Sequence, residues 1–90
     1  MDIIKSVSET IAQRRACSEV AIEVLGDLSI TKEVYHRKRD EFLGKAKDLY
    51  PDRSQHLDFI KCYEYGRYKH YLNKVECCDL LAKHILEFFN

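Results

Sequence analysis

The sequence LDFIKCYEYGRYKHYLNKVECCDLLAKHILEFF, residues 57–89, carries a stripe of mostly apolar and aromatic side chains at steps of three and four residues. The stripe consists of Leu57, Ile60, Glu64, Tyr68, Tyr71, Val75, Cys78, Ala82, Ile85 and Phe89. Such steps place all of these side chains on one face of an α-helix. Nothing between Arg53 and Phe89 forces a stop, so we predict one long helix there, with Gly66 permitting a kink.

Two further helices are predicted upstream, over residues 2–25 and 32–50. Their apolar positions are Ile4, Val7, Ile11, Cys17, Val20, Ala21, Val24 and Leu25 in the first helix, and Val34, Phe42, Ala46 and Leu49 in the second. Gly26 stands where a left-handed residue commonly ends a helix. Residues 27–31 are therefore expected to form a turn between the two helices.

A second break is expected at Pro51, because the residue before a proline avoids the helical region. Asp52 followed by Gln55 resembles a capping box, which would start the last helix. The predicted fold class is all-α. It is a three-helix up-down-up arrangement with a long C-terminal helix, in a single domain over residues 1–90.

The composition fits a helical globular chain. Of the 90 residues, 46% are hydrophobic and 33% are charged, which argues against a disordered tail. Three glycines and one proline are too few for a turn-rich β-sandwich. No stretch approaches the ~18 apolar residues that a membrane span needs, and no secretory signal is recognisable, so we expect a cytoplasmic protein that does not bind membranes.

The predicted helices differ in length. At 1.5 Å per residue the third would be roughly 55 Å long, against about 35 Å and 28 Å for the first two. We expect an apolar strip of the third helix to remain uncovered, which favours self-association, as a homodimer, or a dedicated partner. The residues expected to mediate folding or self-association are Leu72, Val75, Leu81, Leu86 and Phe89.

A tyrosine-rich segment, residues 61–71, is the second candidate surface. Tyrosine and arginine are over-represented at binding hot spots because they combine a large contact area with a polar group. The candidate partner-binding residues are Tyr63, Tyr65, Arg67, Tyr68 and Lys69. The alternative is ordinary amphipathic packing, with the rings on the core and the hydroxyls in water.

The charges balance overall, with fifteen Lys and Arg against fifteen Asp and Glu, so a general polyanion binder is not expected. Bases concentrate locally around residues 36–39 and 67–69. The alternative function is therefore a nucleic-acid-associated regulator, in which basic side chains meet phosphates. Those side chains would be Arg37, Lys38, Arg39, Arg67 and Lys69.

No pattern indicates catalysis, a metal or a cofactor. The four cysteines and four histidines lack the spacings that place two metal ligands on one helical turn. Cys77 lies beside Glu76 and near Asp79, whose negative charges disfavour a reactive thiolate, and the chain has no glycine-rich phosphate loop. Without a secretory context we expect reduced thiols, no catalytic residue, no metal, no cofactor and no small-molecule ligand.

The sequence thus predicts a small non-catalytic protein–protein interaction module, acting as an adaptor, an inhibitor or a chaperone-like cofactor. It would bind a partner or a second copy of itself through helix packing.

Overall fold

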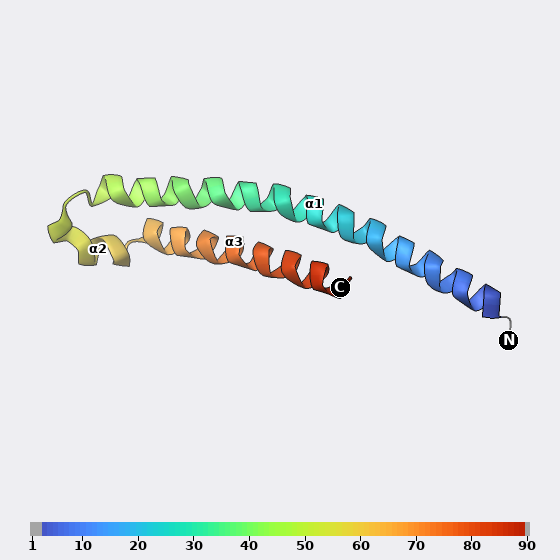
Figure 1. Cartoon of the computed structure of the whole chain (residues 1–90). Coiled ribbons are helices and arrows are strands. Elements are labelled where there is room, and N and C mark those ends of the chain that lie inside the picture. Colours follow the sequence, from blue (N-terminus) through green and yellow to red (C-terminus); the bar gives the residue numbers. More distant parts are fainter. Residues whose placement is uncertain (1–2, 90) are drawn as a thin grey trace.

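The computed structural model describes residues 3–89 and contains three α-helices (Figure 1). They are α1 (Ile3–Leu49), α2 (His56–Lys61) and α3 (Tyr63–Phe88), with a 3-10 turn η1 (Arg53–Gln55) before α2. No strand occurs in the described range. The prediction of an all-α chain with three helices and a long C-terminal helix is confirmed.

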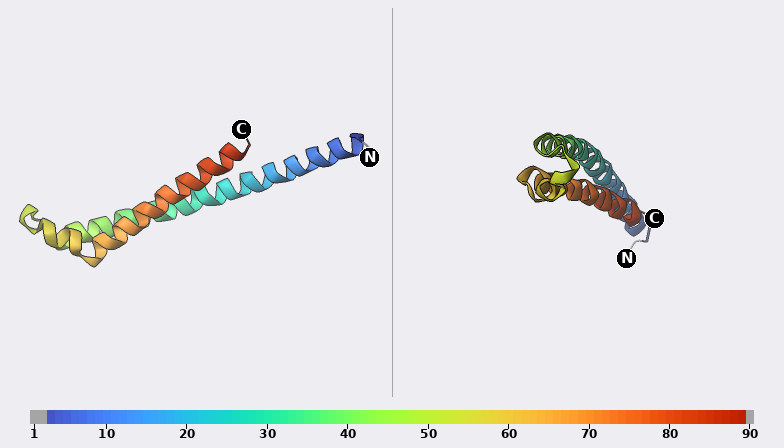
Figure 2. Two further views of the ribbon diagram at one scale, coloured as in Figure 1. Left: turned by 90° about the horizontal axis from the view of Figure 1, so that it is seen from below. Right: turned by 90° about the vertical axis from the view of Figure 1, so that its left-hand side faces the viewer.

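The molecule is a hairpin of two long antiparallel helices, α1 and α3, which η1 and α2 join at one end (Figures 1 and 2). It measures 74 × 18 × 16 Å, and its radius of gyration is 21.4 Å. A compact chain of this length would have a radius of gyration of about 12 Å. The protein is therefore a rod rather than a globule.

The two helices meet along one seam. On α3 its half-buried or buried residues are Glu64, Tyr68, Tyr71, Val75, Cys78, Ala82 and Ile85. On α1 they are Ala21, Leu25, Leu28, Lys32, Tyr35, Arg39, Phe42 and Ala46. Both sets step by three and four residues, as in a coiled coil. The spacing pattern thus correctly identified the face of α3 that packs, although that face is covered by the same chain.

The buried core is thin. Among the described residues only Ala46, Val75 and Cys78 are buried, with exposed fractions of 0%, 5% and 6%. The other seam residues keep part of their surface in water. Two helices side by side enclose few side chains, so many large apolar side chains of residues 3–89 stay exposed.

The predicted turn at residues 27–31 is wrong, because α1 continues through it without a break. Gly26 does not adopt a positive φ. Leu28 and Lys32 continue the seam, and the ammonium group of Lys32 forms an ion pair with Asp79 of α3. A glycine permits a helix end but does not require one, and here packing against α3 maintains the helix. The two predicted N-terminal helices are thus a single one.

The C-terminal part begins differently from the prediction. The expected capping box is present, but it caps η1. The expected continuous helix over residues 53–89 breaks at Cys62, whose backbone is extended (φ −73°, ψ 158°). Gly66, the expected kink, lies inside α3, and its N–H donates to the Cys62 carbonyl at 3.2 Å.

These boundaries reverse the expected mismatch in length. The prediction that the C-terminal helix is too long for the rest of the chain to cover is wrong. Instead α1, with 47 residues, extends past the end of α3, with 26 residues (Figure 1). The apolar strip that this chain leaves uncovered therefore lies near the N-terminus.

Cys62 caps α3 with its side chain. Its Sγ accepts a hydrogen bond from the backbone N–H of Tyr65 at 3.4 Å, and its thiol donates to the carbonyl of Phe59 at 3.0 Å. The thiol thereby occupies the place where serine or aspartate usually satisfies a free N–H group at a helix start.

The continuity of α1 predicts the effect of replacing its glycines with alanine. A Cβ at either Gly26 or Gly44 would meet nothing within 4 Å. Gly26→Ala should therefore stabilise the fold by about 1 kcal/mol, as should Gly44→Ala. The melting temperature should rise by about 4–8 °C in each case, measured by circular dichroism. Destabilisation by Gly26→Ala alone would mean that Gly26 ends a helix.

The capping role of Cys62 predicts a difference between two substitutions. Cys62→Ser keeps a side-chain acceptor for the Tyr65 N–H and should leave the free energy of unfolding nearly unchanged. Cys62→Val removes the acceptor and should cost about 0.5–2 kcal/mol. Equal losses for serine and valine in urea titrations would show that the thiol does not act as a cap.

Candidate protein-binding surfaces

An apolar groove lies between α1 and α3 at the open end of the hairpin. Its volume is about 550 Å³, and its apolar lining includes Cys17, Val20, Val24, Leu81, Ile85 and Phe88. Val20 and Phe88 are 58% and 74% exposed, and the rings of Phe88 and Phe89 meet edge to face at 5.1 Å. Covering such a surface with another apolar surface lowers the free energy of the system.

The second surface is the N-terminal overhang, which we define as residues 3–15 of α1. It extends beyond the end of α3 (Figure 1), and all of its residues are exposed. Its apolar residues Ile4, Val7 and Ile11 are 78%, 53% and 50% exposed. Steps of three and four residues lead from Ile11 through Arg14 and Ser18 to Ala21, the first seam residue of α1. Ile4, Val7 and Ile11 therefore continue the seam towards the N-terminus.

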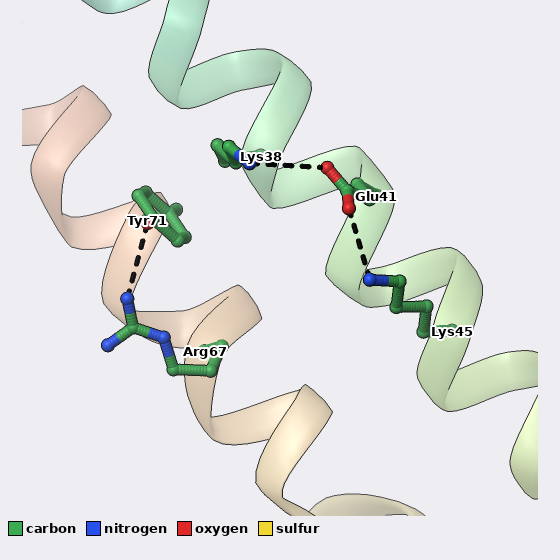
Figure 3. A network of polar contacts seen from close by, with 5 residues as sticks. All are labelled: Lys38, Glu41, Lys45, Arg67 and Tyr71. Carbon is green, nitrogen blue, oxygen red and sulfur yellow. Dashed lines mark hydrogen bonds and ion pairs between the residues drawn. The ribbon is translucent and has the colours of Figure 1, made fainter.

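Among the predicted partner-binding residues, Arg67 contacts its own chain most extensively. Its guanidinium carbon lies 5.1 Å from the ring centre of Tyr71 and 5.9 Å from that of Phe42. Its Nη2 donates a hydrogen bond to the Tyr71 hydroxyl at 3.2 Å (Figure 3). The rings of Phe42 and Tyr71 are stacked at 5.9 Å, so this cluster joins α1 to α3.

The other four predicted residues do not share one environment. Tyr65 is half-buried and contacts Phe59 of α2 at 5.0 Å and the half-buried Tyr68 at 5.5 Å between ring centres. Tyr63, 70% exposed, meets the Phe42 ring edge-on at 6.5 Å. Lys69 is exposed. Of the five residues, only Tyr63 and Lys69 are thus widely accessible, and a binding role for this segment stays a prediction.

The predicted self-association residues also separate. Val75 is buried and Leu72 half-buried, whereas Leu81, Leu86 and Phe89 are exposed. Leu81 and Phe89 line the apolar groove.

Sequence reasoning placed Ile4, Val7 and Val20 on a helix face that packs internally. It missed them as an accessible surface because it ended the first helix at residue 25.

The basic residues of the nucleic-acid alternative lie partly against acids. Lys38 pairs with Glu41 at 3.7 Å, and Arg39 pairs with Asp40 at 3.1 Å. Arg67 belongs to the aromatic cluster described above. Arg37 and Lys69 are exposed. These contacts divide the five bases between local pairs and the surface instead of gathering them on one face.

Glu41 sits between two lysines on the outer side of α1 (Figure 3). The Lys45 ammonium donates a hydrogen bond to its carboxylate at 3.1 Å, and the charge of Lys38 adds to the effect. Together they hold the pKa of Glu41 below its ordinary value. The ionised carboxylate therefore favours the folded state.

Among the residues that the structure describes, the thiols and the potential metal ligands form no metal site. Cys17, Cys62, Cys77 and Cys78 are all free thiols. Within residues 3–89, no three His, Cys, Asp or Glu side chains are grouped closely enough to hold a metal ion. In the same range, no helix combines the length and the apolar character that crossing a membrane requires.

The Glu41 contacts predict an order of effects. Lys45→Met should raise the pKa of Glu41 towards its ordinary value, and Lys38→Met should raise it less, because Lys45 makes the larger contribution. Since the folded-state pKa is lowered, the associated stability is present above the unfolded-state pKa. It is lost as the pH falls through the folded-state pKa. The pKa of Glu41 in each variant is measured from the NMR chemical shift of its carboxyl carbon as a function of pH. A larger rise of the pKa with Lys38→Met than with Lys45→Met would contradict the assignment.

The chain matches no protein-family model, no curated protein and no solved structure.

Proposed function

We propose that this protein is a non-catalytic helical interaction module, which binds another protein helix at the open end of the hairpin. The observation that carries the proposal is the continuation of the α1 seam beyond the end of α3. Val7 and Ile11 present there the kind of apolar edge that α3 covers elsewhere on α1. A helix laid along this edge would bury it as α3 buries the rest.

The apolar groove supports the same function. It adjoins the overhang, because Cys17 and Phe88 line both this groove and a hollow that reaches Thr10 and Arg14. The overhang and the groove are thus adjacent, and the hollow between them is lined partly by the polar residues Thr10, Gln13 and Arg14. Exposed apolar patches of this kind commonly mark protein-interaction sites, and large aromatic side chains such as Phe88 supply much of the binding energy.

The tyrosine-rich end of the hairpin is the secondary contact in this proposal. Tyr63 and Lys69 present a ring and a charge to solvent, whereas Arg67 contributes mainly by joining α1 to α3. A partner long enough to run along the hairpin would contact both the apolar groove and Tyr63.

Site-specific photo-crosslinking in cells of the native host tests the proposal. A benzophenone amino acid at Ile11, which is half exposed on the overhang, should form adducts with a protein, whether a second copy or a different chain. The same group at Glu33, exposed and further along α1, is the matched control and should form few. Equal yields at both positions, or no protein adduct at Ile11, would contradict the proposed surface.

A further inference from the structure

The overhang leaves a gap of definite length beside α1. At 1.5 Å per residue α1 is about 70 Å long and α3 about 39 Å, and residues 3–15 span about 20 Å. Along these 20 Å the position that α3 occupies further on is open (Figure 1). A helical segment of about this length, ending next to Phe88 and Phe89, would therefore fill the open position.

We infer that the overhang pairs antiparallel with the overhang of a second copy of this chain, with Val7 facing the partner's Ile11. This inference rests on the proposed function and names the partner. The pairing is isologous, so each overhang fills the gap beside the other and both gaps close together. The length match is automatic, because the same segment of 13 residues supplies both sides.

The seam residues fit this register. In an antiparallel pair, the residues at the first apolar position of a heptad face those at the second in the other helix. Ile4 then faces the partner's Arg14, and Val7 faces the partner's Ile11, around a two-fold axis close to Glu9. The two central layers are wholly aliphatic. Arg14 lies in the outer layers, where its stem covers Ile4 and its charge reaches water.

The residues beside the seam also permit close approach. In the same register Ser8 faces the partner's Ser8, Thr10 faces the partner's Thr10, and Ile3 lies near the partner's Cys17. None of these is charged, so the pairing brings no like charges together. The charged Lys5 and Glu9 fall on the outer face of the helix.

The position of α3 selects the antiparallel arrangement. A parallel partner using the same seam would meet α3 from Ala21 onward, because α3 already covers that stretch. An antiparallel partner instead leads away from the hairpin, and its N-terminal end abuts Phe88 and Phe89. A hollow of about 620 Å³ lies at this junction, lined partly by Thr10, Arg14 and Phe88. It would receive the partner's Ile3.

The cost of ordering the overhang is small. An isolated helix of this length is marginal in water, because its first turn is costly to form. Here the overhang extends a helix that α3 already stabilises, so its nucleation cost is met within each chain. The interface is nevertheless short, and we expect a dissociation constant of the dimer in the micromolar range.

Light scattering after size exclusion, together with small-angle X-ray scattering, tests the inference on the full chain. Between about 10 µM and about 1 mM the mass should rise from 10.7 kDa towards twice that value. The dimer should be about 130 Å long, which is close to twice the 74 Å length of one hairpin minus the overlap of about 20 Å. A chain that stays at 10.7 kDa throughout, or a dimer about as long as one hairpin, would overturn the inference.

Two matched variants locate the contact. Val7→Asp with Ile11→Asp should weaken dimerisation at least tenfold. Val20→Asp, which places one aspartate in the groove, should change the dissociation constant little. Val7 and Ile11 do not pack against α3, and Val20 is 58% exposed and lies beside the seam residue Ala21, so thermal unfolding of the hairpin should be largely preserved in both variants. Loss of the dimer with Val20→Asp but not with the overhang variant would overturn the inference in favour of packing through the groove.

The two experiments distinguish failure of the second-copy pairing from failure of the proposed function. A monomeric chain that still forms Ile11 adducts with a different protein would overturn the second-copy pairing and support the interaction module. Absence of both the dimer and any protein adduct would overturn both.

Discussion

The packing of α1 against α3 along one seam is the interaction on which the rest of the structure depends. It joins two helices that would be marginal alone, and it does so with only three buried residues among those described. Because the seam is long and narrow, the chain forms a rod and leaves much apolar surface accessible. The proposed binding to another helix rests on the same geometry, since a two-helix hairpin encloses few of its own apolar side chains.

Polar side chains on the seam fix its register. Lys32 pairs with Asp79 across the two helices, and the Lys74 ammonium lies 4.9 Å from the ring centre of Tyr35 and 5.3 Å from that of Tyr71. Arg67 plays a similar part against Phe42. A slip by one heptad would separate these partners while keeping apolar residues in contact. The apolar residues therefore supply attraction, and the cationic ones favour one alignment.

The sequence predicts the packing face of α3 well, because the steps from Glu64 to Ile85 follow a helical repeat without interruption. It predicts the end of α1 for an equally local reason, the backbone restriction imposed by Pro51. It fails at Gly26, where a local preference competes with packing against α3, which no local pattern reveals. The same failure concealed the overhang as a candidate site, since Val7 and Ile11 become accessible only when α1 outruns α3.

The unbroken course of α1 is the central claim, and one intramolecular distance tests it. Pulsed dipolar spectroscopy measures the separation between spin labels at Glu9→Cys and Lys47→Cys. The exposed Cys17 and Cys77 are replaced by serine so that they are not labelled. Dilution with unlabelled protein removes distances between chains. A continuous helix predicts about 57 Å between these positions. A separation of less than half that value would show that the chain folds back near Gly26, and it would contradict this account.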